Sequence, residues 1–195
     1  MFKVEIGYLN AEQVARSLGA AADQVPYALA LALNRSAEVT RNLLIRQTWP
    51  GAVHARNSSF IAASLTTRDS RASKSSLSVE IYDKLDRGNL QMQARGGMKT
   101  PLRGSNLAIP ASDVPRGPHG VPKRLKPANL VNSFRKQGKL YTRDGKGRLK
   151  LVYTLKPQTR IPKRVPFYED FEASMRRELL RTLPLAVEKA MRTRR

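Results

Sequence analysis

The sequence contains no cysteine and only two histidines, His54 and His119. Without cysteine, the chain can form no disulfide, no thiolate metal site and no cysteine nucleophile. The two histidines lie 65 residues apart, and neither accompanies a serine-nucleophile motif or paired carboxylates. We therefore expect no metal, no cofactor and no enzymatic activity, and we assign no catalytic residue. A nuclease would need clustered acids or histidines that the sequence lacks.

Long apolar runs are also missing. No stretch approaches the roughly 20 apolar residues that are needed to span a bilayer. The first ten residues contain one lysine and no apolar run, which is not the pattern of a secretory signal. We expect a soluble protein that is made in the cytoplasm and has no membrane partner.

Acidic residues are scarce where basic residues are most frequent. The chain has 36 Lys and Arg against 15 Asp and Glu, a formal net charge of +21. Residues 84–164 contain 20 of the basic residues and only three acidic ones, so this stretch alone carries +17. A surface with that much charge of one sign repels itself unless polyanions or acidic partner surfaces lie nearby. We expect nucleic acid, an acidic protein surface or both as neighbours.

Eight cations of this stretch are the candidate contacts to DNA or to a partner. They are Lys99, Arg103, Arg116, Lys123, Arg124, Arg143, Lys146 and Arg148. The glycine pair before Lys99 has neither a Walker pattern nor a Gly-x-Gly-x-x-Gly series, so we interpret it as a hinge or turn rather than a phosphate cradle. Aromatic residues in the stretch are few (Phe134, Tyr141 and Tyr153), and we interpret them as core or strand positions. Charge contact with a nucleic-acid backbone is therefore expected, without base stacking or sequence reading.

The periodicity of apolar residues predicts an α+β fold in one domain that covers residues 1–195. Two long helices dominate it, one over residues 26–48 and one over residues 167–191. Trp49-Pro50-Gly51 is expected to end the first long helix, because proline cannot continue it. Shorter helices are expected over residues 11–22, 58–63 and 127–136, the last with Leu130, Val131 and Phe134 facing inward.

Alternating apolar and polar residues predict five strands, over residues 2–8, 65–68, 77–82, 139–142 and 149–155. The last two form a hairpin around Asp144-Gly145-Lys146-Gly147, whose glycines suit a tight turn. We expect these strands to form one small antiparallel sheet that the two long helices cover. Residues 85–121, interrupted by glycine and proline, are expected to form an extended basic arm with one short strand at 107–109.

Several short motifs, read in order, resemble the minor tail protein Z family of tailed bacteriophages, and together they span most of the chain. The motifs are PYALALALNRSA at residues 26–37, Ala55-Arg56-Asn57 with Phe60-Ile61, Ala94-Arg95-Gly96-Gly97 with Pro101, Leu107-Ala108-Ile109-Pro110, and Val165-Pro166-Phe167 before the last helix. The basic stretch 116–126 and the hairpin have no counterpart in that pattern.

The resemblance implies a neck or tail-completion protein of a long-tailed phage. Such a subunit would form a homo-oligomeric ring, expected to be a hexamer, at the head-proximal end of the tail. Its partners would be the tail terminator and the head–tail connector, and genomic DNA would pass through the ring without sequence-specific contact. The protein would assemble in the host cytoplasm and end up in the virion. The alternative is a stand-alone basic protein that binds nucleic acid without sequence specificity.

Overall fold

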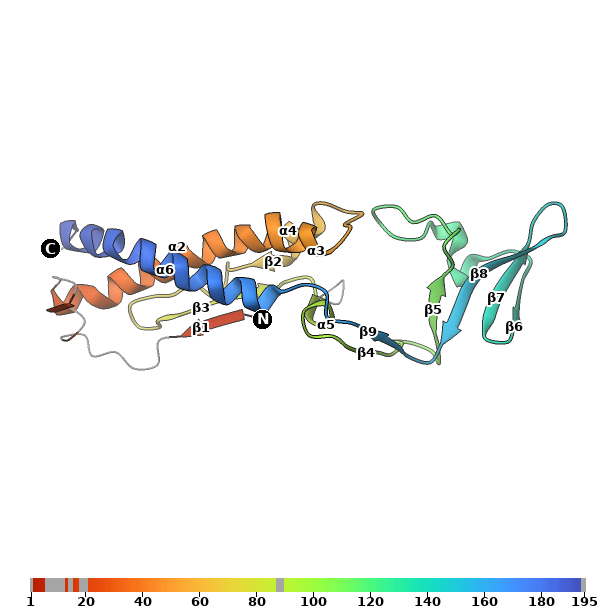
Figure 1. Cartoon of the computed structure of the whole chain (residues 1–195), viewed down its shortest axis with the longest axis horizontal. Coiled ribbons are helices and arrows are strands. Elements are labelled where there is room, and N and C mark those ends of the chain that lie inside the picture. Colours follow the sequence, from red (N-terminus) through yellow and green to blue (C-terminus); the bar gives the residue numbers. More distant parts are fainter. Residues whose placement is uncertain (1, 6–12, 14–15, 18–20, 87–89, 194–195) are drawn as a thin grey trace. The chain divides into compact units, whose positions relative to one another are not determined.

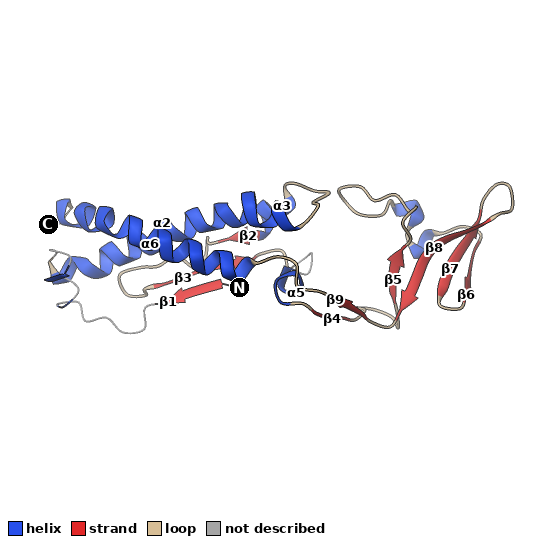
Figure 2. Ribbon diagram, viewed as in Figure 1, coloured by secondary structure: helices blue, strands red, loops and turns tan. Residues whose placement is uncertain are grey.

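The computed structural model describes residues 2–5, 13, 16–17, 21–86 and 90–193. The chain divides into two compact units, which we call the helical unit (1–54, 58–94 and 164–195) and the β unit (55–57 and 95–163) (Figure 1). The long helices, blue in Figure 2, belong to the first unit, and most of the strands, red in Figure 2, to the second. The predicted α+β class is confirmed. Two compact units can still unfold together, so one domain over residues 1–195 stays a prediction.

The first long helix of the helical unit extends further than the sequence predicts. It comprises α2 (Val25–Leu43), the π-helical turn η2 (Leu44–Thr48) and α3 (Trp49–Ala52). In η2, the amide of Trp49 donates to the carbonyl of Leu44, five residues back. Pro50 sits within the first two positions of α3, where a missing amide is tolerated. The prediction that Trp49-Pro50-Gly51 ends the helix is therefore wrong, because the wider turn before Pro50 lets the chain continue.

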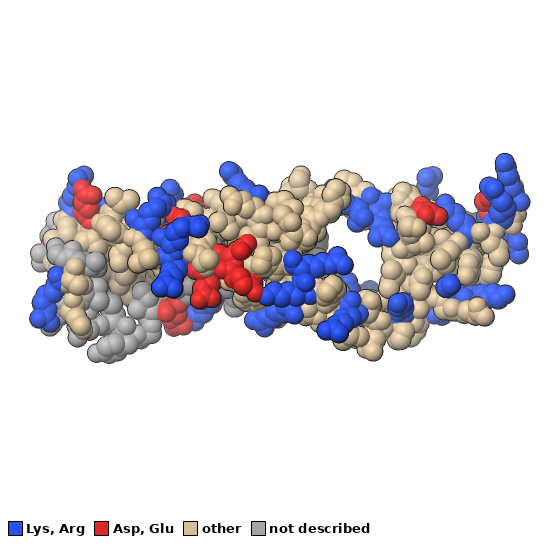
Figure 3. Space-filling view, in the orientation of Figure 1, with Lys and Arg blue, Asp and Glu red and all other residues tan. Residues whose placement is uncertain are grey.

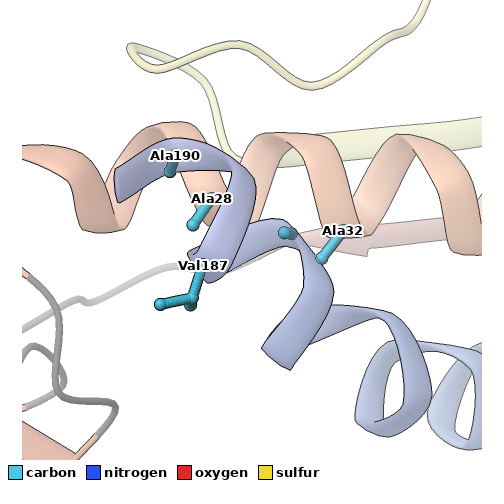
Figure 4. Close-up of a cluster of buried hydrophobic side chains, with 5 residues drawn as sticks. Ala28, Ala32, Val187 and Ala190 are labelled. Carbon is cyan, nitrogen blue, oxygen red and sulfur yellow. The ribbon is translucent and has the colours of Figure 1, made fainter. Parts of the chain in front are cut away.

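The second long helix, α6 (Phe167–Arg192), confirms the predicted C-terminal helix and packs along α2. Ala28 and Ala32 of α2 are buried against Val187 and Ala190 of α6 (Figure 4). Small side chains let two helix backbones approach closely. The alanine-rich face of α2 therefore packs against a helix of the same chain.

Hydroxyl groups join the same two helices across the buried interface. The Ser36 and Thr182 hydroxyl oxygens lie 3.0 Å apart, and those of Thr40 and Ser174 lie 2.8 Å apart. Thr182 also donates to the carbonyl of Glu178 at 2.7 Å, so Ser36 is the donor to Thr182. These bonds satisfy polar groups that would be costly to bury alone.

A small antiparallel sheet with the order β1-β3-β2 completes the helical unit, and α2 contacts its central strand. The strands are β1 (Phe2–Glu5), β2 (Leu65–Thr66) and β3 (Ser78–Asp83), and the short helices are α4 (Phe60–Ser64) and α5 (Leu90–Arg95). The Asn34 amide binds both the carbonyl and the amide of Ala72, at 2.9 and 2.8 Å, which attaches the loop before β3 to α2. The strand expected over 2–8 is described only to Glu5, and most of the helix expected over 11–22 lies outside the described residues.

In the described part of the β unit, the strands form two antiparallel sheets. A two-stranded ribbon pairs β4 (Gly97–Lys99) with β9 (Thr159–Ile161). A four-stranded sheet has the order β5-β8-β7-β6. Its strands are β5 (Leu107–Pro110), β6 (Ser133–Lys136), β7 (Lys139–Arg143) and β8 (Leu149–Lys156). The β7–β8 hairpin is confirmed, but it does not join the sheet of β1 to β3 as the sequence analysis expected, because β5 and β6 occupy its two edges.

The helix expected over residues 127–136 is wrong. The structure has two short 3-10 turns, η3 (Lys123–Leu125) and η4 (Pro127–Asn129), followed by β6. Asn132 has a φ of 50°, which a right-handed helix cannot include. Gln137 and Gly138 have φ values of 49° and 68° between paired strands, which is the geometry of a type I′ hairpin turn. Val131, expected to face inward, is 79% exposed.

The stretch 85–121, expected to be an irregular arm, contains α5, β4 and β5. Leu90 and Ala94 on α5 are buried in the helical unit. The short strand expected at 107–109 is confirmed by β5, which pairs with β8.

Candidate polyanion interface

Positive charge is concentrated in the β unit. Of the residues that form it, 18 are Lys or Arg and two are Asp or Glu, a net charge of +16. The helical unit has as many basic residues, 18, but 13 acidic ones, a net charge of +5. In the view of Figure 3, acidic side chains gather over the helical unit, whereas Lys and Arg dominate the β unit. The β unit is therefore the more strongly positive part of the molecule and the candidate surface for a polyanion.

All eight predicted contact residues lie in the β unit, in three separate segments. Lys99 ends β4 and Arg103 lies in the loop after it. Arg116, Lys123 and Arg124 belong to the connection between β5 and β6, and Arg143, Lys146 and Arg148 surround the β7–β8 turn. Seven of the eight are exposed, and Lys99 is half-buried.

The β7–β8 turn is ordered by Asp144. Its carboxylate accepts bonds from the amides of Lys146 and Arg148, both at 2.9 Å, and from the Arg148 guanidinium at 2.8 Å. The amide and guanidinium of Arg148, followed by the amide of Lys146, lower the pKa of Asp144. Arg143 donates to the carbonyl of Gly147 at 3.2 Å. The turn therefore holds two guanidinium groups in place and leaves the Lys146 side chain exposed.

The connection between β5 and β6 uses its cations partly for its own structure. Arg116 donates to the carbonyls of Pro110 and Ala111, at 2.8 and 3.2 Å, which fixes the loop against the end of β5. The Tyr153 hydroxyl donates to the carbonyl of Leu125 at 2.7 Å, and burial raises the pKa of that tyrosine. This bond attaches the short turn that carries Lys123 and Arg124 to the core of the sheet. We therefore expect Arg116 to contribute more to the loop than to a partner.

Sequence reasoning missed a groove at the ribbon of β4 and β9. Its volume is about 670 Å³, and its lining includes Arg95, Arg160 and Lys163 and no acidic residue. A Cβ at Gly96 would come within 3.1 Å of the Lys163 amide nitrogen, and Gly96 has a φ of 76°. The glycine is therefore required by a close backbone approach, which agrees with the interpretation as a turn. Only the ribbon pairing brings these cations together, since Arg95 and Arg160 are 65 positions apart.

Other types of site find less support in the part of the chain that the structure describes. Among those residues, no group of three or more His, Asp or Glu side chains is placed to hold a metal ion. No helix in the described ranges is long and apolar enough to cross a membrane. The positive surface of the β unit is therefore the candidate functional site.

Comparisons with known proteins add no relative: no family model, no curated protein and no solved structure matches this chain.

Proposed function

We propose that this chain is a structural subunit of the neck of a tailed bacteriophage, a tail-completion protein of the minor tail protein Z type. It would act as a homo-oligomeric ring at the head-proximal end of the tail, between the tail terminator and the head–tail connector. A phage tail is proposed as the particle because the sequence motifs resemble the minor tail protein Z family. The observation that carries it is the separation of charge between the two units.

The helical unit supplies the rigid body of the subunit in this proposal. Most of the buried apolar residues lie in it, along α2 and α6 and the sheet beneath them. Leu180 and Leu185 on α6 remain 71% and 61% exposed, respectively. In a ring, such side chains are available for contact with the neighbouring copy.

The β unit supplies the electrostatic part. Its net charge of +16 would be neutralised by an acidic surface of a neighbouring protein or by the DNA that passes through the ring. Its exposed cations are spread over strands, loops and turns of several segments rather than along one element that fits a groove. Such an arrangement suits contact with the sugar–phosphate backbone and no reading of sequence. No bond would be made or broken in this role.

The alternative function is that of a stand-alone basic protein that binds nucleic acid without sequence preference, and the same charge separation supports it. The two functions differ in stoichiometry and in salt dependence. A free nucleic-acid binder acts as a monomer or dimer, and its affinity falls steeply as salt rises. A neck subunit forms a closed ring and is present in fixed copy number in particles.

The test uses the full chain, freed of nucleic acid at high salt. Mass photometry over a range of protein concentrations and negative-stain images should show closed rings with one copy number, expected to be six. Quantitative mass spectrometry of virions that carry the gene should find the protein at the same copy number. A monomer at every concentration, absent from virions, would overturn the neck function and leave the stand-alone binder.

A further inference from the structure

The four-stranded sheet of the β unit has two different faces, and the strand register assigns residues to each. Leu140 pairs with Tyr153 and Ala108 with Leu155, and all four belong to the apolar cluster around Val114 and Val152. Directly opposed residues of antiparallel strands share a face, and successive residues alternate. The alternation is interrupted once: Leu140 pairs with Tyr153 but Tyr141 pairs with Leu151, so Val152 is the extra residue of a β-bulge. Val152 and Tyr153 are both buried in the core cluster, and Leu151 lies on the opposite face. The face that bears Leu140 and Tyr153 is therefore the core face.

The other face, which we call the open face, bears a row of aromatic and apolar side chains. Phe134 of β6 pairs with Tyr141 of β7, which pairs with Leu151 of β8. The Phe134 and Tyr141 rings stack with centroids 5.7 Å apart and planes inclined by 19°. Both residues are half-buried, and they stand apart from the apolar cluster of the core face. Neighbouring Leu149, at the start of β8, is 56% exposed.

Cations surround this row on the same face. Lys136 and Lys139 pair with each other beside it, and both are exposed. The Arg143 guanidinium lies over the Phe134 ring, 5.8 Å from its centroid. The sequences of β5 to β8 contain no Asp or Glu, so no acidic residue of the sheet opposes these charges.

We propose that the open face binds single-stranded nucleic acid, with bases stacking on Phe134 and Tyr141 and phosphates meeting Lys136, Lys139 and Arg143. The two rings already stack on one another and Arg143 lies over Phe134, so a base of any kind would add to an outer π-face of this pair, while the cations beside it follow the backbone. Paired bases of a duplex cannot reach the rings, so the aromatic row adds a preference that charge alone does not create. The site goes beyond the proposed neck function and does not depend on it. It replaces the sequence-based expectation of nucleic-acid contact without base stacking.

Charge and the stacked rings together argue against the other possible occupants of this face. The β unit of a second copy would bring another +16 against it. An acidic protein would satisfy the lysines but makes no particular use of two stacked rings. Duplex DNA would satisfy the lysines and leave the rings half-exposed. Single-stranded nucleic acid provides both the negative charge and the flat apolar surfaces that the face can accept.

The first experiment measures binding of the full chain to a fluorescein-labelled oligothymidylate of about 12 nucleotides and to a duplex of the same length, by anisotropy at several salt concentrations. We expect the single strand to bind roughly tenfold tighter than the duplex at matched salt. Replacing the rings by β-branched residues that suit a strand, Phe134→Val with Tyr141→Val, should remove this preference and leave duplex binding unchanged. Tyr141→Phe should retain it, because the ring stays.

One matched pair and one further variant serve as controls. Arg135 and Lys136 are adjacent exposed cations on β6 that point to opposite faces, so Lys136→Gln should weaken single-strand binding more than Arg135→Gln does. Tyr27→Phe changes a tyrosine of the helical unit and should leave binding as it is. Thermal melting of each variant shows that it is folded.

A measurement on the unaltered protein keeps the test independent of variant stability. Photocrosslinking to an oligonucleotide that contains 5-iodouracil, followed by peptide mapping, should label Phe134 or Tyr141. Equal affinity for single strand and duplex, with crosslinks only to loop residues, would overturn the proposal. Tight capture of an acidic peptide by the open face, competing with neither nucleic acid, would overturn it in favour of a protein partner. Neither result bears on ring formation, so the neck function stands or fails separately.

Discussion

The helical unit and the β unit differ most in how they use apolar and charged residues. Of the buried apolar residues that the structure describes, only Val114, Val152 and Tyr153 lie in the β unit. That unit nevertheless carries a net charge of +16, whereas the helical unit, with the larger core, carries +5. A thin core combined with strong self-repulsion gives low stability in isolation. We therefore expect the helical unit to be the more stable of the two in isolation, and we propose that a partner stabilises the β unit.

The largest effect should come from the core of the helical unit. Phe167 is buried and its ring lies 6.0 Å from that of Trp49, stacked at 13°. Phe167→Ala should lower the free energy of unfolding by about 3–5 kcal/mol, through lost burial and a cavity. Trp49 is the only tryptophan, so its fluorescence during chemical denaturation follows the helical unit.

The control for this experiment is Phe134→Ala, a ring of the β unit. If the units unfold separately, it leaves the Trp49 transition where it was. A shift of that transition in the control as well would show that the two units unfold as one domain, and would break the comparison.

The hydroxyl contacts between α2 and α6 should give the next largest effect. Thr40→Val removes the partner of the buried Ser174 hydroxyl, which should cost about 1–3 kcal/mol of unfolding free energy. Adding Ser174→Ala to that variant should recover part of the loss, because no buried hydroxyl is then left unpaired. A double variant that is less stable than the sum of the two single changes would contradict this account.

The free energy of unfolding of the helical unit should depend on pH through Glu178. Its buried side chain accepts a bond from Arg181, which is the main reason why its pKa is lowered, and Arg177 adds to the effect. The stabilisation is present above the unfolded pKa of about 4.3 and is lost as the pH falls through the lower folded value. Glu178→Gln should cost about 1–2 kcal/mol at neutral pH and progressively less in acid, as seen in denaturation curves.

Glu172→Gln is the matched control, since Glu172 is an exposed residue of the same helix. It should alter the unfolding free energy little at any pH. A gap between wild type and Glu178→Gln that stays constant down to acidic pH would exclude the ion pair as the cause.

The smallest predicted effect is a difference in how the two units respond to salt. Raising the ionic strength screens the repulsion among the cations of the β unit. Hydrogen exchange measured by mass spectrometry should therefore slow roughly twofold to fivefold for β7 and β8, with little change for α2. Equal responses of the two units would mean that charge does not limit the stability of the β unit.

Much of the fold could be predicted from local patterns. The long helix after residue 167, the β7–β8 hairpin and the strands of the first sheet follow from apolar periodicity and turn residues. The prediction for residues 127–136 was wrong because Leu130, Val131 and Phe134 have helical spacing, while the turn at Gln137 and Gly138 decides for a hairpin. The helix end at Trp49 was misplaced because a π-turn before a proline has no clear sequence signature.

The candidate interface could also be predicted only in part. Its location in the basic middle of the chain was predictable, because net charge is a property of composition and survives any folding. Two features could not be predicted, because they depend on which strands pair and in which register. They are the groove lined by Arg95, Arg160 and Lys163 and the open face with Phe134 and Tyr141.

The sequence by itself determined the charge, the absence of cysteine chemistry, the two long amphipathic helices and the position of the basic segment. Tertiary structure alone decided that the basic segment folds as a unit with its own sheet, and which of its aromatic rings face away from the core. The physical reason is that helices and charge arise from neighbouring residues, whereas a sheet face is created by pairing between strands that are distant along the chain.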